Sequence, residues 1–193
     1  MQLRRLFSTD SVKGSKGYLD SQKKYEVIRT VLYFGISLSL FVAGYLQTKD
    51  KANLLTIVAV LGCLPASKSA VSAVMYLRYK SLNGQTAEKI EAHCQGLACL
   101  YDMVFTSYKK NFVVGHLAVC GNTVCGYSED SGFQEGEFGR HIDGILKMDG
   151  HKGVTVKIFT SLSKYTERLD QMRELKEEAG TGAVLVTLKS VAL

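Results

Sequence analysis

The chain has no tryptophan, a single proline among 193 residues, and two long stretches without any charged residue. These stretches are residues 30–48 and 52–67. As helices rising ~1.5 Å per residue they would be roughly 28 and 24 Å long. A bilayer core is about 30 Å thick, so each stretch is a slightly short candidate for a membrane span. The sequence therefore predicts a transmembrane hairpin with spans at about 30–48 and 52–70.

Negative charge is also scarce, which gives a net charge of +6. Seven lysines and arginines precede the first apolar stretch, against three acidic residues, and Arg78, Lys80 and Lys89 follow the second. Flanking basic residues mark the cytoplasmic side of a membrane and attract anionic lipid headgroups. We therefore expect a multi-pass protein of the cell inner membrane with both termini in the cytoplasm. This account of the charge makes the lipid bilayer the expected partner and argues against nucleic acid.

The only proline, Pro65, lies inside the second stretch, and Lys68 follows it closely. In a hairpin closed by residues 47–52, Lys68 would lie level with Arg29 at the cytoplasmic headgroups, with Glu26 as its partner. Pro65 would kink the helix just before it leaves the bilayer. Arg29, Pro65 and Lys68 are thus the predicted membrane-interface residues. The alternative is a longer, tilted helix in which Lys68 lies near the midplane and lines a pore.

The chain divides at these spans into three parts. Residues 1–25 form a basic cytoplasmic segment, residues 26–81 hold the hairpin with a juxtamembrane helix, and residues 82–193 form a cytosolic domain. Small residues in both spans suit close helix packing, either within the hairpin or between the subunits of a homo-oligomer.

The domain alternates between helical and strand patterns. Apolar residues at helical spacing from Ala87 to Leu97 predict a first helix, and three buried strands follow, with a tight turn at Gly121-Asn122. A helix around residues 138–145, a strand at 153–161, a helix from Ser161 onward and a last strand at 183–189 complete the pattern. The expected order is α-β-β-β-α-β-α-β, a small mixed α/β sheet domain covered by helices.

This order, together with Gly84 and Glu88 at the first helix and His116 and Asn122 around the second strand, resembles the restriction-endonuclease-like core. It is most similar to the nuclease-related domain of bacterial membrane-linked proteins, over residues 83–162. The resemblance implies an aspartate, a glutamate and a lysine that hold a divalent metal ion and act on water. Those three positions carry Gly115, Ser128 and Asp130 instead.

The mismatch predicts a domain that is not an enzyme, since fold alone is no warrant for activity. Glu88, His116, Glu129 and Asp130 are the candidate catalytic residues of an alternative metal site. That alternative makes the chain a membrane-tethered, metal-dependent nuclease, provided the four side chains converge.

Other chemistry has little support in the sequence. Ser161, Ser163 and Lys164 open a helix and are candidates for binding an anion, although helix capping is the commoner role of serines at such a position. Cys94 and Cys99, like Cys120 and Cys125, are spaced too widely for a zinc knuckle and are expected to be buried, reduced thiols. The glycine-rich segments match no phosphate or dinucleotide motif, so we expect no metal and no cofactor.

Together these patterns predict a two-pass, bacterial-type membrane protein that presents a non-catalytic, nuclease-like α/β domain for binding or assembly. A second hypothesis makes it a ligand-gated oligomeric effector, in which a small anion bound to the domain shifts the hairpins. In that case Lys68 would line the pore.

Overall fold

The computed structural model describes residues 13–50, 53–174 and 180–193. Most of the predicted N-terminal basic segment that precedes residue 13 therefore lies outside the described residues. The chain falls into two compact units. The first contains residues 19–80, and the second joins residues 13–18 to residues 81–193.

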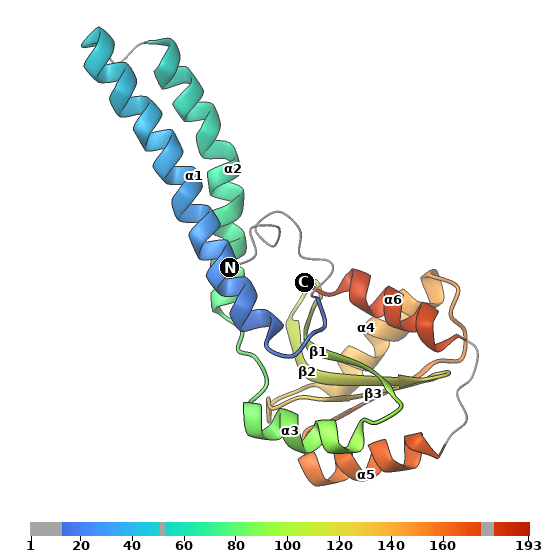
Figure 1. Cartoon of the computed structure of the whole chain (residues 1–193). Helices are drawn as coiled ribbons and strands as arrows, with labels where there is room; N and C mark the ends of the chain where they lie inside the picture. Colours follow the sequence, from blue (N-terminus) through green and yellow to red (C-terminus); the bar gives the residue numbers. More distant parts are fainter. Residues whose placement is uncertain (1–12, 51–52, 175–179) are drawn as a thin grey trace. The chain divides into compact units, whose positions relative to one another are not determined.

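The first unit is a helical hairpin. Helix α1 (Tyr18–Thr48) and helix α2 (Leu54–Leu77) are both long and apolar enough to cross a membrane. Asn53 caps α2, because its side chain accepts a hydrogen bond from the Thr56 N–H at 2.9 Å. The predicted juxtamembrane continuation is part of α2, which runs without interruption past Lys68 (Figure 1).

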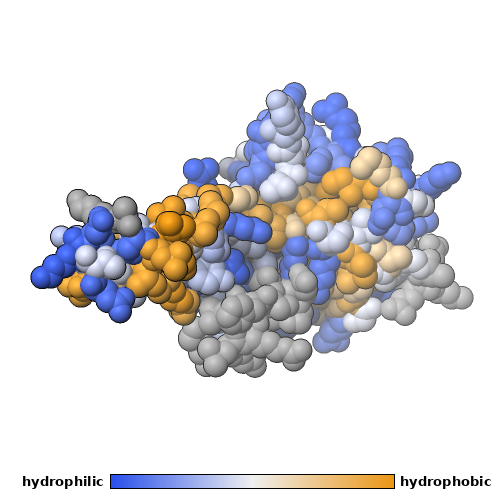
Figure 2. Space-filling model, turned by 90° about the horizontal axis from the view of Figure 1, so that it is seen from above, coloured by the Kyte–Doolittle hydropathy of each residue, from blue (hydrophilic) through white to orange (hydrophobic). Residues whose placement is uncertain are grey.

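Large exposed hydrophobic side chains are concentrated on this hairpin. Of 23 such side chains in the described residues, eleven lie on α1 and nine on α2. Figure 2 shows them gathered beside the polar end of the hairpin. Soluble monomers rarely expose a contiguous apolar surface of this kind, and a helix that is apolar on all sides is typical of a membrane span. Exposed surface and helix length therefore agree with two membrane-spanning helices.

Small residues bring α1 and α2 close together. Ser37, Ala59 and Ala66 are buried, and a Cβ atom added at Gly62 would lie 2.7 Å from the Ser37 Oγ. Glycine at position 62 thus lets the Ser37 hydroxyl approach α2, and a larger residue would require this hydroxyl to rotate. The sequence analysis expects small residues to pack either within the hairpin or between subunits, and the structure contains the packing within the hairpin.

The second unit is a mixed α/β domain, as the sequence predicts. Its sheet has the order β1-β2-β3-β4, in which the pairs β1–β2 and β2–β3 are antiparallel and the pair β3–β4 is parallel. The predicted tight turn at Gly121-Asn122 joins β2 to β3, since Cys120 pairs with Thr123. The elements are α3 (Gly84–His93), β1 (Ala98–Thr106), β2 (Asn111–Cys120), β3 (Thr123–Tyr127), α4 (Glu135–Met148), β4 (Thr155–Phe159), α5 (Leu162–Arg173) and α6 (Thr181–Val191).

Helices cover both faces of the sheet (Figure 1). On one face α4 and α6 enclose the larger core, which is rich in phenylalanine. On the other face α3 and α5 enclose a smaller core that contains Ile90, Tyr165, Leu169 and the buried cysteines. Three layers result, with an apolar core on each side of the sheet.

The predicted last strand at residues 183–189 is wrong, because this segment belongs to helix α6. Its apolar residues fit both periods: Val184, Val186 and Leu188 alternate as in a strand, while Val184 and Leu188 are also one helical turn apart. In the structure Val184 and Leu188 are buried and Val186 is 66% exposed. Helical spacing therefore decides which side chains reach the core.

The outer edge of β1 is covered by the first and the last residues of the second unit. The Tyr101 N–H donates to the Gly14 carbonyl at 2.8 Å, and the Leu193 N–H donates to the Val104 carbonyl at 2.7 Å. Lys13 Nζ bonds the carbonyl of Ala192, which links the two flanks. An uncovered edge strand invites pairing with other chains, so these segments protect the sheet.

Candidate functional sites

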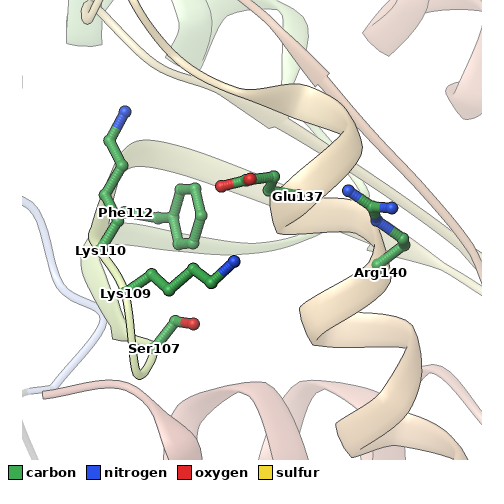
Figure 3. A pocket seen from close by; sticks show the side chains of 6 residues that line it. All are labelled: Ser107, Lys109, Lys110, Phe112, Glu137 and Arg140. Atoms are coloured by element: carbon green, nitrogen blue, oxygen red, sulfur yellow. The ribbon is translucent and has the colours of Figure 1, made fainter.

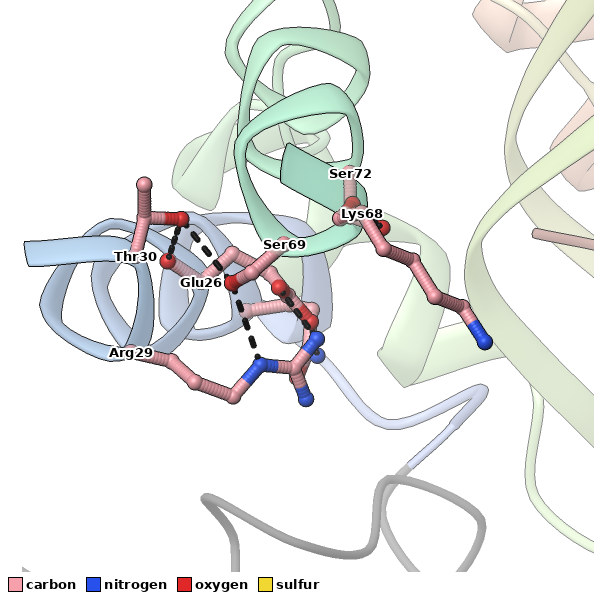
Figure 4. A network of polar contacts seen from close by, with 7 residues as sticks. Glu26, Arg29, Thr30, Lys68, Ser69 and Ser72 are labelled. Atoms are coloured by element: carbon pink, nitrogen blue, oxygen red, sulfur yellow. Dashed lines mark hydrogen bonds and ion pairs between the residues drawn. The ribbon is translucent and has the colours of Figure 1, made fainter. Parts of the chain in front are cut away.

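Arg29 lies in a polar network inside the hairpin (Figure 4). Its Nη2 lies 2.6 Å from the Glu26 Oε2, and its Nε donates to the Ser69 Oγ at 3.3 Å. Thr30 shares a 2.9 Å hydrogen bond with the same Ser69 oxygen. The network places residues 26–30 of α1 level with residue 69 of α2, which is the register that the sequence predicts for Arg29 and Lys68.

The predicted pairing of Glu26 with Lys68 is wrong. Glu26 is buried and pairs with Arg29 on its own helix, whereas Lys68 is exposed and extends away from the network (Figure 4). Ser69 faces α1, and successive residues of a helix point about 100° apart, so Lys68 points elsewhere. Pro65 is exposed within the unbroken α2. Lys68 therefore stays a predicted membrane-interface residue.

The candidate nuclease residues do not converge. Glu88, Glu129 and Asp130 are exposed, whereas His116 is completely buried on β2. The Asp130 Oδ1 accepts a hydrogen bond from the Gly132 N–H at 2.9 Å and so shapes the loop after β3. In the described part of the chain these four side chains form no metal-sized group.

The position where the resemblance implies an aspartate has no room for one. A Cβ atom at Gly115 would lie 2.7 Å from the Leu82 Cδ1 and 3.3 Å from its Cβ. Leu82 cannot easily withdraw, because its N–H donates to the buried Asp102 Oδ1 at 2.8 Å. Leu82 therefore packs against the position at which the resemblance places a catalytic aspartate.

We expect Gly115→Asp to lower the free energy of unfolding by about 3 kcal/mol or more, and to create no metal-dependent DNA cleavage. The change adds both overpacking and a buried carboxyl group. Gly115→Ala adds only the overpacking and should cost about 1–3 kcal/mol. Denaturant titration of both variants gives the two free energies. A stable Gly115→Asp protein that cuts DNA with Mg²⁺ would instead support the nuclease hypothesis.

The candidate anion-binding residues Ser161, Ser163 and Lys164 are exposed at the start of α5. Ser161 is the N-cap residue of α5, although its side chain makes no capping hydrogen bond. The predicted capping by a serine side chain is therefore not found at Ser161. Anion binding by these residues stays a prediction.

His116 meets two cysteines that the sequence analysis leaves apart. The ligand atoms of Cys94, Cys99 and His116 all lie within 4.8 Å of one another. The Cys94 Sγ is 3.5 Å from the His116 Nε2, and the His116 Nδ1 is 2.6 Å from the Tyr165 Oη. Tyr101 packs edge-on against the imidazole with ring centroids 4.5 Å apart. We call Cys94, Cys99 and His116 the thiol–imidazole cluster.

The two thiols of this cluster have shifted pKa values in opposite directions. A hydrogen bond between Cys94 and Cys99 raises the pKa of Cys94, with burial adding to the rise. The same hydrogen bond lowers the pKa of Cys99. Burial raises the pKa of Tyr165 well above its ordinary value. Tyr165 therefore stays a neutral phenol beside the imidazole, and Cys99 is the readier thiolate of the pair.

Motif spacing does not reveal this cluster, because its members converge only once β1 and β2 are paired. Tyr101 lies opposite His116 in that pairing, and Cys99 lies opposite Ala118. Cys99 and His116 are thus diagonal neighbours on one face of the sheet. Their proximity could be predicted from the sequence only by deducing the β1–β2 register from the turn between the two strands.

A polar cavity of about 180 Å³ lies between the β1–β2 turn and the start of α4. Figure 3 shows Lys109, Glu137 and Arg140 extending toward one another, while the Lys110 ammonium group points away. Lys110 donates to the Gly132 carbonyl at 3.3 Å. Both cationic groups and a carboxylate line the cavity, so its charge does not favour anionic ligands over cationic ones. Its lining residues are Ser107, Lys109, Lys110, Phe112, Glu137 and Arg140.

No family model, curated protein or solved structure matches this chain.

Proposed function

We propose that this protein is a two-pass integral membrane protein that presents a non-catalytic, nuclease-like α/β domain in the cytosol for binding or assembly. One observation carries the proposal: residues 13–18 and 81–193 belong to a single compact unit, although the apolar hairpin separates them in the chain.

This arrangement supports an even number of membrane crossings. The Gly14 carbonyl before α1 accepts a hydrogen bond from the Tyr101 N–H after α2, and Lys16 forms a 3.0 Å ion pair with Glu91. Both contacts require the two flanks of the hairpin to lie on the same side of a membrane. A chain in which only one helix crosses would lose them.

Charge supports the cytosol as that side. Lys13 and Lys16 precede α1, and Arg78 and Lys80 follow α2, so the shared side carries the basic residues. The thiols of the domain also suit a reducing compartment: its four cysteines are free, and three of them are buried. The inner membrane of a cell, with both flanks cytoplasmic, fits these features.

The absence of catalysis rests on the predicted nuclease positions. Gly115 is packed by Leu82, and the buried Ser128 donates its hydroxyl to the Val113 carbonyl at 2.7 Å. Neither position supplies a carboxylate for a divalent metal ion. Binding or assembly is then the function left to the domain. Homo-oligomer formation stays a prediction, which a mass measurement on the detergent-purified protein tests.

Topology is tested with two single-cysteine additions to the otherwise intact chain. Gln47→Cys lies at the exposed end of α1, and Ser131→Cys lies in the exposed loop after β3. We expect a membrane-impermeant maleimide to label Gln47→Cys in intact cells and Ser131→Cys only after permeabilisation. The unmodified protein is the control for labelling of the native thiols. The membrane fraction should retain all three proteins after washing at high pH.

Two results would contradict the proposal. Labelling of Ser131→Cys in intact cells would place the domain outside the cytosol. Release of the protein into the supernatant by the alkaline wash would show that the hairpin does not span the bilayer.

A further inference from the structure

The thiol–imidazole cluster combines three ligand atoms within a distance that one metal ion can bridge. The two Sγ atoms and the ring nitrogen lie within 4.8 Å of one another. Ligands at ~2.3 Å for sulfur and ~2.0 Å for nitrogen from a central ion are separated by comparable distances. Only small side-chain movements would be needed to close such a site.

The three ligands come from separate, well-fixed elements. Cys94 is the C-cap residue of α3, Cys99 lies on β1, and His116 lies on β2. Cys94 and His116 are buried, and Cys99 is half-buried. A site on paired strands and a helix end is more rigid than one on loops, and the half-buried thiol gives an ion a way in.

Tyr165 orients the imidazole as the outer-shell partner of a metal-bound histidine does. Its Oη lies 2.6 Å from the His116 Nδ1, and its hydroxyl also faces the Cys125 carbonyl at 3.5 Å. In the tautomer that carries its proton on Nδ1, the phenol oxygen accepts from the Nδ1–H. The Nε2 lone pair is then directed at the thiols.

We propose that Cys94, Cys99 and His116 bind one thiophilic d¹⁰ cation, Zn²⁺ or Cu⁺. Thiolate and imidazole ligands favour these ions over Mg²⁺ or Ca²⁺, which prefer oxygen. Binding of one ion displaces the protons of the two thiols, while the neutral imidazole contributes its lone pair. Two cysteines and one histidine leave a fourth tetrahedral position open, as in zinc sites that bind a further ligand.

This proposal differs from the expectation of buried, inert thiols. A thiol that only fills space needs apolar neighbours, yet the Cys94 Sγ faces the Nε2 of a histidine whose Nδ1 contacts the Tyr165 hydroxyl. A reducing compartment argues against a Cys94–Cys99 disulfide. The whole site lies in the α/β unit, so its failure would leave the proposed membrane topology untouched.

The test uses the full chain, purified in detergent with a non-thiol reductant and stripped of metal. Co²⁺, the spectroscopic substitute for Zn²⁺, should bind one ion per chain and give thiolate-to-metal absorption bands. Zn²⁺ should displace it. Cu⁺ is titrated separately against a chromogenic chelator, and the tighter of the two ions identifies the preferred cation.

The matched variants are Cys99→Ser and Cys63→Ser, which make the same change inside and outside the cluster. We expect Cys99→Ser to weaken binding at least 100-fold and to abolish the absorption bands, and Cys63→Ser to bind like the unmodified chain. Cys99 is half-buried, so its serine variant should fold, which circular dichroism checks. Equal binding by the two variants, or no binding by the unmodified chain, would overturn the proposal.

Tyr165→Phe separates positioning of the ligand from packing. The phenyl ring keeps the volume of the side chain but removes the acceptor for the His116 Nδ1–H. We expect metal affinity to fall about 10- to 100-fold, as when an outer-shell partner of a ligand is removed. A fold-preserving Tyr165→Phe change that leaves affinity unaltered would show that this hydrogen bond does not orient a ligand.

Discussion

Replacing Arg29 by leucine should destabilise the hairpin by about 3–5 kcal/mol, because removal of one partner leaves a buried charge uncompensated. The side chain of Glu26 is only 5% exposed, and its carboxylate lies 2.6 Å from the Arg29 guanidinium. Without Arg29, the carboxylate keeps the hydrogen bond that it accepts from the Gln22 amide at 3.2 Å. The interhelical hydrogen bond from Arg29 to Ser69 is lost as well.

Unfolding of the detergent-solubilised protein in a denaturing detergent, followed by hydrogen exchange of the hairpin peptides, measures this change. Lys68→Leu is the matched control: it also removes one cation, from an exposed side chain, and should change stability by less than about 0.5 kcal/mol. Glu26→Gln combined with Arg29→Leu should recover most of the loss, since no charge then remains buried. Equal effects of Arg29→Leu and Lys68→Leu would show that the buried pair does not hold the helices together.

The Lys68→Leu protein also bears on the effector hypothesis. If Lys68 lined an oligomeric pore, its replacement would abolish ion leakage from vesicles that contain the unmodified chain. An interfacial Lys68 would leave leakage unchanged. The exposed position of Lys68 on α2 is compatible with both outcomes.

The second large effect is expected at Phe138, where alanine should lower the stability of the domain by about 3–5 kcal/mol. Phe138 is 1% exposed, and its ring centroid lies 5.4 Å from those of Phe105, Phe112 and Phe133. All three contacts are edge-to-face: two join α4 to β1 and β2, and the third joins α4 to the loop that precedes it. Truncation removes both the buried area and all three ring contacts.

Hydrogen exchange of the β2 amides reports this loss, because exchange of the central strand requires opening of the sheet. Phe138→Leu keeps most of the volume and should cost about 1.5 kcal/mol or less. Tyr108→Ala removes a fully exposed aromatic ring from the β1–β2 turn and should have almost no effect. If Phe138→Ala costs no more than Phe138→Leu, the aromatic contacts do not organise this core.

The sequence identifies best those features that depend on one local pattern. The charge-free stretches predict the hairpin, and continuous apolar runs predict the strands from Ala98 to Tyr127 and their order in the chain. The pattern is ambiguous at residues 183–189, where strand and helix periods coincide. There, only burial of Val184 and Leu188 against the sheet decides the outcome.

Contacts between residues that are distant in the sequence cannot be predicted from local patterns. The sequence analysis pairs Glu26 with Lys68, whereas the observed pairing with Arg29 depends on which side of α2 faces α1. Cys94 and Cys99 fit no metal motif alone, and His116 is far from both in sequence. The three converge because α3 packs over a strand pair whose register places Cys99 diagonal to His116. Such proximity is a property of the sheet and not of spacing along the chain.

The contact of Gly14 with the edge of β1 has a consequence for biogenesis. If only one of the two helices of a nascent chain entered the membrane, residues 13–17 and β1 would lie in different compartments. The Tyr101 N–H of β1, which donates to the Gly14 carbonyl, would then have lost this partner. An unpaired edge strand can pair with other chains. Half-integrated molecules would thus carry a mark that chaperones and proteases recognise, so the covered edge of β1 depends on both helices crossing.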